Sequence, residues 1–139
     1  MILIDTNALV GLVDHTDPLN RQAAADFARL AKRNLFVISA VIAEALHLLP
    51  SKNERERLLN LLDEFQITIC PIPESAELWM EVFAWLLRYG EHSPDWADGV
   101  LSVMSGHEKK LRIWSYDSEF RTIWRRPDGS AIPMAVVAR

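Results

Sequence analysis

Four carboxylates stand where apolar stretches of the sequence meet a loop or the start of a helix. Asp5 directly follows the strand-like run ILI, and Asp117 directly follows the strand-like run IWSY. Glu44 is the only acidic residue in VISAVIAEALHLL, and Asp98 lies near the start of the apolar stretch DWADGVLSVMS. An unpaired charge beside buried apolar sequence is costly, so each of these carboxylates needs a partner or a function.

Gathering such acids in one place has an electrostatic consequence. Two carboxylates about 4 Å apart repel by roughly 1 to 4 kcal/mol. No lysine or arginine stands beside Asp5, Glu44 or Asp98 in the sequence, so a bound proton or a bound cation must compensate. Carboxylate oxygens suit Mg²⁺ or Mn²⁺, and Mg²⁺ uses only one or two protein carboxylates together with substrate phosphates. The pattern predicts a site for one or two such ions that hydrolyses phosphodiester bonds.

The elements that must position these acids alternate along the chain. Strand-like runs occupy residues 1–5, 35–39, 67–72 and 112–116. Helix-like stretches occupy residues 18–32, 40–49, 54–65, 74–89 and 95–109. This alternation is typical of a parallel sheet with crossover helices, in which ligands bind beyond the carboxyl ends of the strands. Asp5 and Asp117 are therefore expected at the same edge, and residues 131–137 are predicted to form a last edge strand.

Composition limits the classes of protein to be considered. The chain has 139 residues, half of them hydrophobic, and is expected to form a single domain over residues 1–139. It has no membrane-spanning stretch and no signal-like start, so we expect a cytoplasmic protein. The net charge of −4 does not suggest a broad basic surface, so a nucleic acid must be held by a local patch or through cations. Cys70, the only cysteine, is expected in the core, and glycine-rich phosphate loops are absent from the sequence.

Three stretches resemble, in order and spacing, the motifs of PIN-domain ribonucleases, and in particular those of the short VapC-like toxins of toxin–antitoxin pairs. They are LIDTNALVGL, VISAVIAEALHLL and DWADGVLSVMSGHEKKLRIWSYDSEF. The resemblance implies a three-layer α/β/α fold around a central, mostly parallel sheet. It also implies Mg²⁺- or Mn²⁺-dependent cleavage of RNA and inhibition by a cognate antitoxin protein.

The resemblance also assigns residues. It implies that Asp5, Glu44, Asp98 and Asp117 form the acidic site, with Asp5 and Asp98 as the most direct metal ligands. The helpers that it implies are small polar residues, namely Thr6, Asn7 and Ser115. Gly99 stands where the family commonly has alanine, and a glycine there is expected to weaken the helix by up to about 1 kcal/mol.

Structural roles compete with these assignments at several positions. Asp5 begins Asp-Thr-Asn, a composition that favours turns and caps by itself. Asp95 lies three residues before Asp98, where it is either the N-cap of a helix or a further contributor to the metal site. Asp117 is also suited to cap a short helix starting near Ser118. Glu44 has no such alternative, because a lone charge in an apolar helix is expensive without a function.

Two further stretches bear on partners. Residues 78–89 are apolar on nearly all sides, which is consistent with a core helix, a homodimer face or a groove for an antitoxin helix. A basic run near the C-terminus is either a solvated surface or a binding surface for RNA phosphates, with Trp124 as a stacking platform. Its members are Lys109, Lys110, Arg112, Arg121, Arg125 and Arg126.

A metal-dependent ribonuclease, the toxin of such a pair, is the function that the sequence favours. A DNA nuclease or phosphoesterase of the same fold would share the metal site and differ in substrate. A non-catalytic binding module on this fold is the other alternative, and the presence of all four acids argues against it.

Overall fold

The computed structural model of the chain describes residues 1–137. Its central sheet has four strands, β1 (Ile2–Ile4), β2 (Leu35–Val37), β3 (Thr68–Ile69) and β4 (Arg112–Trp114). All neighbouring strands are parallel, and their order across the sheet is β3-β2-β1-β4. The predicted parallel sheet is therefore confirmed, and β1 lies at its centre.

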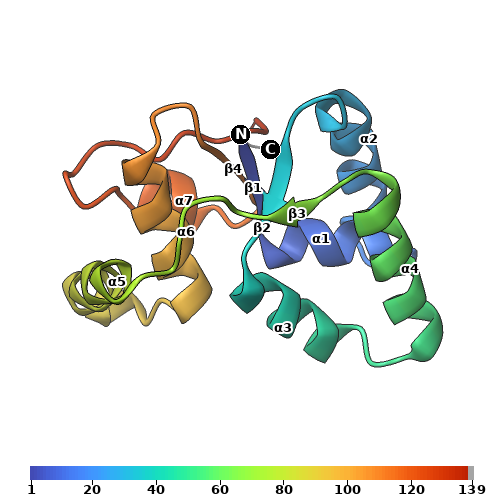
Figure 1. The fold of residues 1–139 in the computed structure, drawn as a ribbon, viewed down its shortest axis with the longest axis horizontal. Helices are drawn as coiled ribbons and strands as arrows, with labels where there is room; N and C mark the ends of the chain where they lie inside the picture. The colour runs from blue at the N-terminus through green and yellow to red at the C-terminus, as the bar shows by residue number, and fades with distance from the viewer. Residues whose placement is uncertain (138–139) are drawn as a thin grey trace.

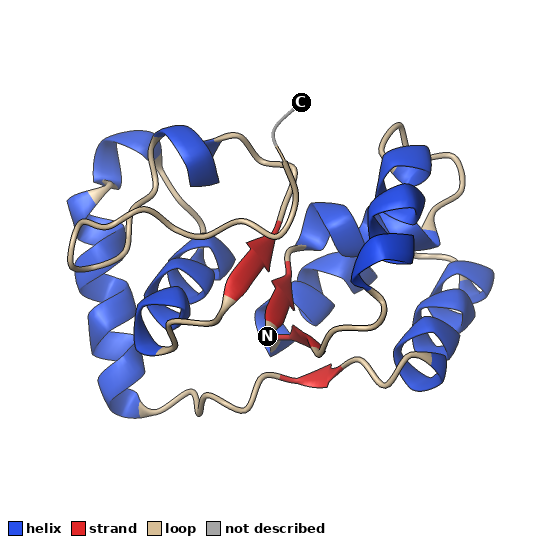
Figure 2. Cartoon of the chain, turned by 90° about the horizontal axis from the view of Figure 1, so that it is seen from above, coloured by secondary structure: helices blue, strands red, loops and turns tan. Residues whose placement is uncertain are grey.

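Helices cover the sheet on both sides, as Figures 1 and 2 show. The helices, in chain order, are α1 (Thr6–Val13), α2 (Asn20–Leu30), α3 (Ser39–Leu48), α4 (Lys52–Glu64), α5 (Ala76–Arg88), α6 (Trp96–His107) and α7 (Glu119–Thr122), with a 3₁₀ turn η1 (Gly90–His92) before α6. Helices α1, α2 and α4 lie on one side of the sheet, and α5, α6 and α7 lie on the other. The three-layer α/β/α fold is thus confirmed.

The core explains why β1 carries no polar alternation. Ile2, Leu3 and Ile4 are fully buried because helices cover both faces of the sheet at this strand. Cys70 is buried and makes no disulfide, as expected of a core cysteine. Within residues 1–137 no helix is long and apolar enough to cross a membrane.

Gly99 has a packing role that the sequence did not reveal. A Cβ atom at this position of α6 would lie 2.9 Å from Val82 Cγ1 and 3.2 Å from Leu86 Cδ2, both on α5. The glycine therefore permits the close approach of α5 to α6, and an alanine here would require the side chain of Val82 or its backbone to shift. The close packing of α5 on α6 that the glycine permits offsets its low helix propensity.

Two elements differ from the prediction. Helix α1 follows β1 directly, where no helix was predicted before residue 18. The predicted edge strand at residues 131–137 is wrong, because this segment makes only two isolated bridges, between Met134 and Ile113 of β4 and between Ala131 and Arg125. Pro133 has no N–H, and the tail is held to β4 by two backbone hydrogen bonds, Ile113 N–H to Pro133 O and Ala135 N–H to Ile113 O.

Candidate functional site

Asp5 stands where β1 ends and α1 begins. Its backbone N–H donates to the carbonyl of Trp114 (2.9 Å), which places it beside the end of β4. Its Oδ1 accepts the backbone N–H of Thr6 (2.8 Å), so Asp5 is also the N-cap of α1. Capping and a place at the ligand-binding edge of the sheet are therefore combined in one residue.

The second oxygen of Asp5 is held by the small polar residues that the sequence had singled out. Ser115 Oγ donates to Asp5 Oδ2 (2.7 Å), and Asn7 Nδ2 lies 3.5 Å from the same oxygen. Asn7 Nδ2 also donates to Ser115 Oγ (3.1 Å). Residues more than a hundred positions apart thus fix the Asp5 carboxylate, which is only 6% exposed.

Thr6 connects the end of β1 to α3. Its hydroxyl donates to Glu44 Oε2 at 3.0 Å, and Glu44 is half-buried. The lone acid of this apolar helix therefore has a polar partner from α1 and points toward the carboxyl edge of the sheet.

Asp95 and Asp98 form a reciprocal cap at the start of α6. The backbone N–H of Asp98 donates to Asp95 Oδ1 (2.8 Å), and the backbone N–H of Asp95 donates to Asp98 Oδ2 (3.1 Å). The prediction that Asp95 is an N-cap is confirmed. This cap also fixes the Asp98 carboxylate in a partly buried position near Asp5.

These carboxylates shift one another's protonation. Burial raises the pKa of Asp5 to about 6, against the hydrogen bonds from Ser115 and Thr6, and the charges of Asp95 and Glu44 add to the rise. Burial raises the pKa of Asp98 to about 8, helped by the charges of Asp95 and Asp5. In the part of the chain that the structure describes, none of the four has an ion pair with lysine, arginine or histidine. The edge of the sheet thus gathers carboxyl groups that have no cationic partner among residues 1–137.

Asp117 reaches this site through its backbone. Its N–H donates to Ser115 Oγ (3.1 Å), and its Oδ1 accepts the N–H of Glu119 (2.9 Å) at the first residue of α7. The structure thus shows the Asp117 carboxylate in a turn that starts α7, and its contribution to a metal site stays a prediction.

A magnesium-like ion fits the donors of this edge, although no metal cage is preformed. Among residues 1–137 no three His, Cys, Asp or Glu side chains are arranged to hold a metal ion. Mg²⁺ takes few protein ligands and keeps several waters, so two carboxylates suffice for it. Asp5 and Asp98 have the raised pKa values of acids that lack a counter-charge, which makes them the residues suited to hold such an ion.

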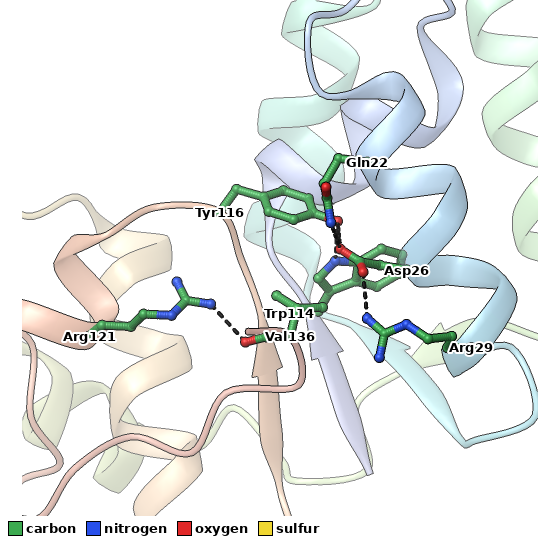
Figure 3. Close-up of polar contacts among 7 residues, drawn as sticks. All are labelled: Gln22, Asp26, Arg29, Trp114, Tyr116, Arg121 and Val136. Carbon is green, nitrogen blue, oxygen red and sulfur yellow. Dashed lines mark hydrogen bonds and ion pairs between the residues drawn. The ribbon is translucent and has the colours of Figure 1, made fainter. Parts of the chain in front are cut away.

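A buried network that the sequence did not reveal braces the segment that carries Ser115 and Asp117 (Figure 3). The Tyr116 hydroxyl donates to Asp26 Oδ2 (2.6 Å) on α2 and accepts from Trp114 Nε1 (3.0 Å). On the other side, the Tyr116 N–H donates to Asn7 Oδ1 (3.0 Å). The turn after β4 is thus held through both the side chain and the backbone of Tyr116.

Asp26 is the anchor of this network. Its carboxylate is 2% exposed and also accepts hydrogen bonds from Gln22 Nε2 (2.7 Å) and Arg29 Nη2. Burial opposes its charged form, but the hydrogen bonds from Tyr116, Gln22 and Arg29 hold the pKa of Asp26 below its usual range. The acid is therefore ionised and fully engaged.

Replacing Tyr116 with phenylalanine is expected to lower the free energy of unfolding by about 1 to 3 kcal/mol. The change removes a hydrogen bond to a buried charge and leaves Trp114 Nε1 without its acceptor. Urea denaturation followed by tryptophan fluorescence measures the loss.

Tyr89 is the matched control, because its hydroxyl makes no hydrogen bond within residues 1–137. Tyr89→Phe is expected to change the stability by less than about 0.5 kcal/mol. Equal effects of the two replacements would show that the hydroxyl of Tyr116 does not brace the turn.

The structure excludes Trp124 as a stacking platform within the basic run near the C-terminus, whereas RNA binding by Arg121, Arg125 and Arg126 stays a prediction. Trp124 is 1% exposed and packs against Trp85 and Tyr89, so the prediction that it offers a stacking platform is wrong. Arg121 is engaged with the carbonyl of Val136 (2.9 Å; Figure 3). Arg126 has its Nε and Nη2 atoms buried, whereas Arg125 and Arg112 are exposed. This segment packs into the hydrophobic core because burying the aromatic ring of Trp124 lowers the free energy of the folded state.

We compared the sequence and the fold with those of known proteins. A family model described as PIN domain matches residues 2–124. A search among curated proteins gave no match. Among solved structures, the crystal structure of Mycobacterium tuberculosis VapC20, described as a Sarcin-Ricin loop cleaving toxin, is similar with a TM-score of 0.71. The two sequences are 17% identical, and the alignment covers 88% of this chain and 94% of the VapC20 chain.

The family model spans most of the chain, from β1 through α7, and includes every acid of the site described above. The fold agrees with that match, because the sheet and the helices superpose on those of a VapC protein. The chain therefore belongs to the PIN domain family.

Proposed function

We propose that this protein is a Mg²⁺- or Mn²⁺-dependent endoribonuclease and the toxin of a type II toxin–antitoxin pair. The observation that carries the proposal is the pair of acids at the carboxyl edge of the sheet, Asp5 and Asp98. Both have raised pKa values, and neither has a protein cation as a partner. Membership of a nuclease family and the likeness to a VapC toxin support this function.

In this proposal each residue of the edge has a defined task. Asp5 and Asp98 would hold one or two ions, which would supply Lewis-acid stabilisation of the scissile phosphate and lower the pKa of an attacking water. Ser115 and Asn7 keep the Asp5 carboxylate in one orientation through their hydrogen bonds. Glu44, fixed by the Thr6 hydroxyl, ligates an ion or orients the water. The further proposed ligands are Asp117 and Asp95.

The biological setting follows from the same likeness. VapC20 is described as a toxin that cleaves the Sarcin-Ricin loop, and we extend the toxin role, though not that particular RNA target, to this chain. A toxin of this kind would act on RNA in the cytoplasm and would be held inactive by a cognate antitoxin protein.

Parallel assays on RNA, DNA and a simple phosphate ester test the proposed substrate class. We expect cleavage of RNA in Mg²⁺ or Mn²⁺, no cleavage in chelator, and little action on DNA or the ester. Cleavage of DNA at the rate of RNA would favour a DNA nuclease, and hydrolysis of the ester alone would favour a phosphoesterase. A folded protein inactive on all three would indicate a binding module.

An exposed apolar face on α5 supports a homodimer. Leu78, Val82 and Trp85 of α5 are buried, whereas the opposite face exposes large apolar side chains. The exposed set is Trp79, Met80, Phe83 and Leu87, with Leu87 82% exposed. Trp96 extends this face, because its ring contacts those of Trp79 and Phe83. Such a contiguous apolar surface is typical of an interface, so we propose self-association through α5.

The replacement Leu87→Glu is expected to convert a dimer into a monomer, because it places a charge on the exposed apolar face at its most exposed residue. Sedimentation equilibrium should give twice the chain mass of 15.9 kDa for the wild type and the single mass for the variant. Leu59→Glu, at another exposed leucine on α4, is the control and should leave the mass unchanged. A monomeric wild type at micromolar concentration would rule out the dimer.

A further inference from the structure

A separate hollow lies at the opposite edge of the sheet, where the strands begin. It has a volume of about 380 Å³ and is lined by Arg29, Arg33 and Arg112 together with Ile2, Leu30 and Met134. Ile2 and Arg112 are the first residues of β1 and β4, whereas the acids follow the last residues of these strands. In a parallel sheet these two sets of residues lie at opposite ends, so the hollow is distinct from the acidic site.

The charge of this hollow is unbalanced. Its three arginines come from α2, from the loop before β2 and from β4, and no acidic residue lines it within the described part of the chain. Arg29 pairs with Asp26, which already shares its charge with Tyr116 and Gln22. Arg112 Nη1 reaches only a carbonyl, that of Met134 at 3.4 Å, and Arg33 has no ion pair in residues 1–137. Guanidinium groups do not deprotonate in proteins, and all three arginines are exposed, so the hollow presents a positive surface that favours a bound anion.

We propose that this arginine hollow is a phosphate-binding site. Guanidinium groups match the geometry of phosphate oxygens, with two parallel N–H donors to one anion. A volume of about 380 Å³ lies within the range of small-ligand sites and exceeds what a phosphate alone would fill. Met134, which is partly exposed, is the apolar side chain of the lining that can contact a sugar or base carried by the phosphate. The ligand is a phosphate group, either free or carried by a nucleotide.

Isothermal titration calorimetry in the presence of a metal chelator tests this proposal, since the chelator removes any phosphate binding through ions at the acidic site. The titrants are inorganic phosphate, a ribonucleoside 5′-monophosphate and the same nucleoside without phosphate. We expect saturable binding of one phosphate-bearing ligand per chain and none of the nucleoside. Tighter binding of the monophosphate would identify a nucleotide site, and equal affinities would identify a site for free phosphate.

Single replacements test whether the phosphate binds in the arginine hollow. Arg33→Ala and Arg112→Ala are each expected to weaken binding about tenfold or more, because each removes a charge-assisted hydrogen bond. Arg33→Ala keeps the result interpretable if Arg112→Ala loosens the tail at Met134. Arg21→Ala is the matched control, since it removes the same charge from an exposed position of α2 outside the hollow, and it should bind like the wild type.

Unchanged affinity in the Arg33→Ala variant, or the absence of saturable phosphate binding, would overturn the proposal. Because no RNA cleavage is measured, this outcome is independent of the proposed ribonuclease activity.

Discussion

Replacing Asp5 or Asp98 with asparagine is expected to slow metal-dependent RNA cleavage about 100-fold or more. Asparagine keeps the shape and the acceptor oxygen that caps α1 or α6, but it removes the negative charge that holds the ion. Initial rates at matched Mg²⁺ or Mn²⁺ concentrations measure the loss, with circular dichroism to verify the fold.

Asp63→Asn is the control for the chemical change itself, because Asp63 is exposed near the end of α4, away from the sheet edge. It should cleave RNA at the wild-type rate. Undiminished, metal-dependent cleavage by folded Asp5→Asn or Asp98→Asn protein would remove that acid from the catalytic site.

Without metal, the free energy of unfolding of the wild type is expected to decrease relative to that of Asp5→Asn as the pH rises from 4 to 6. The native Asp5 has a pKa of about 6, whereas the ordinary value is 3.8, so in this window the folded state retains a proton that the unfolded chain has released. Over the whole window the difference amounts to about 2 to 3 kcal/mol. Denaturant titrations of both proteins at several pH values measure it.

The difference between the two proteins isolates Asp5 from acids whose pKa values are lowered, such as Asp26, which stabilise the fold as the pH rises. Asp98 extends the loss of stability toward pH 8, since its native pKa is also raised. Asp98→Asn should therefore remove the decrease in the free energy of unfolding between pH 6 and pH 8. If the free energy of unfolding of the wild type and of Asp5→Asn depended on pH in the same way, the pKa of Asp5 would not be raised in the folded state.

The sheet could be predicted from the sequence because β1, β2 and most of β4 consist of apolar residues that are buried or half-buried. The runs that became β1, β2 and β4 have no polar alternation, and the helical stretches between them leave only crossover connections. Helix α1 could not be predicted in this way. Asp5, Thr6 and Asn7 form a composition typical of turns, and Gly11 weakens the helix pattern. The side chain of Asn20 stabilises that helix from outside by donating to Gly11 O (2.8 Å).

The order of the strands also explains how much of the site could be foreseen. Asp5 and Ser115 follow the ends of neighbouring parallel strands, so a local pattern was sufficient to bring them together. The brace between Asp26 and Tyr116 joins residues 90 positions apart. Gln22 and Arg29 are one turn away from Asp26 on the same helix. From the sequence alone, Asp26 and Arg29 would therefore be interpreted as a solvated ion pair. The burial of Asp26 becomes evident only from the packing of α2 against the segment that follows β4.

A titration with Mn²⁺ at pH 7, followed by calorimetry on the wild type and on Asp5→Asn, tests the central claim most directly. We expect saturable binding of one or two ions to the wild type and loss of that binding in the variant. Equal Mn²⁺ binding by both proteins, or none by the folded wild type, would contradict the claim that the acids at the carboxyl edge of the sheet hold a metal ion.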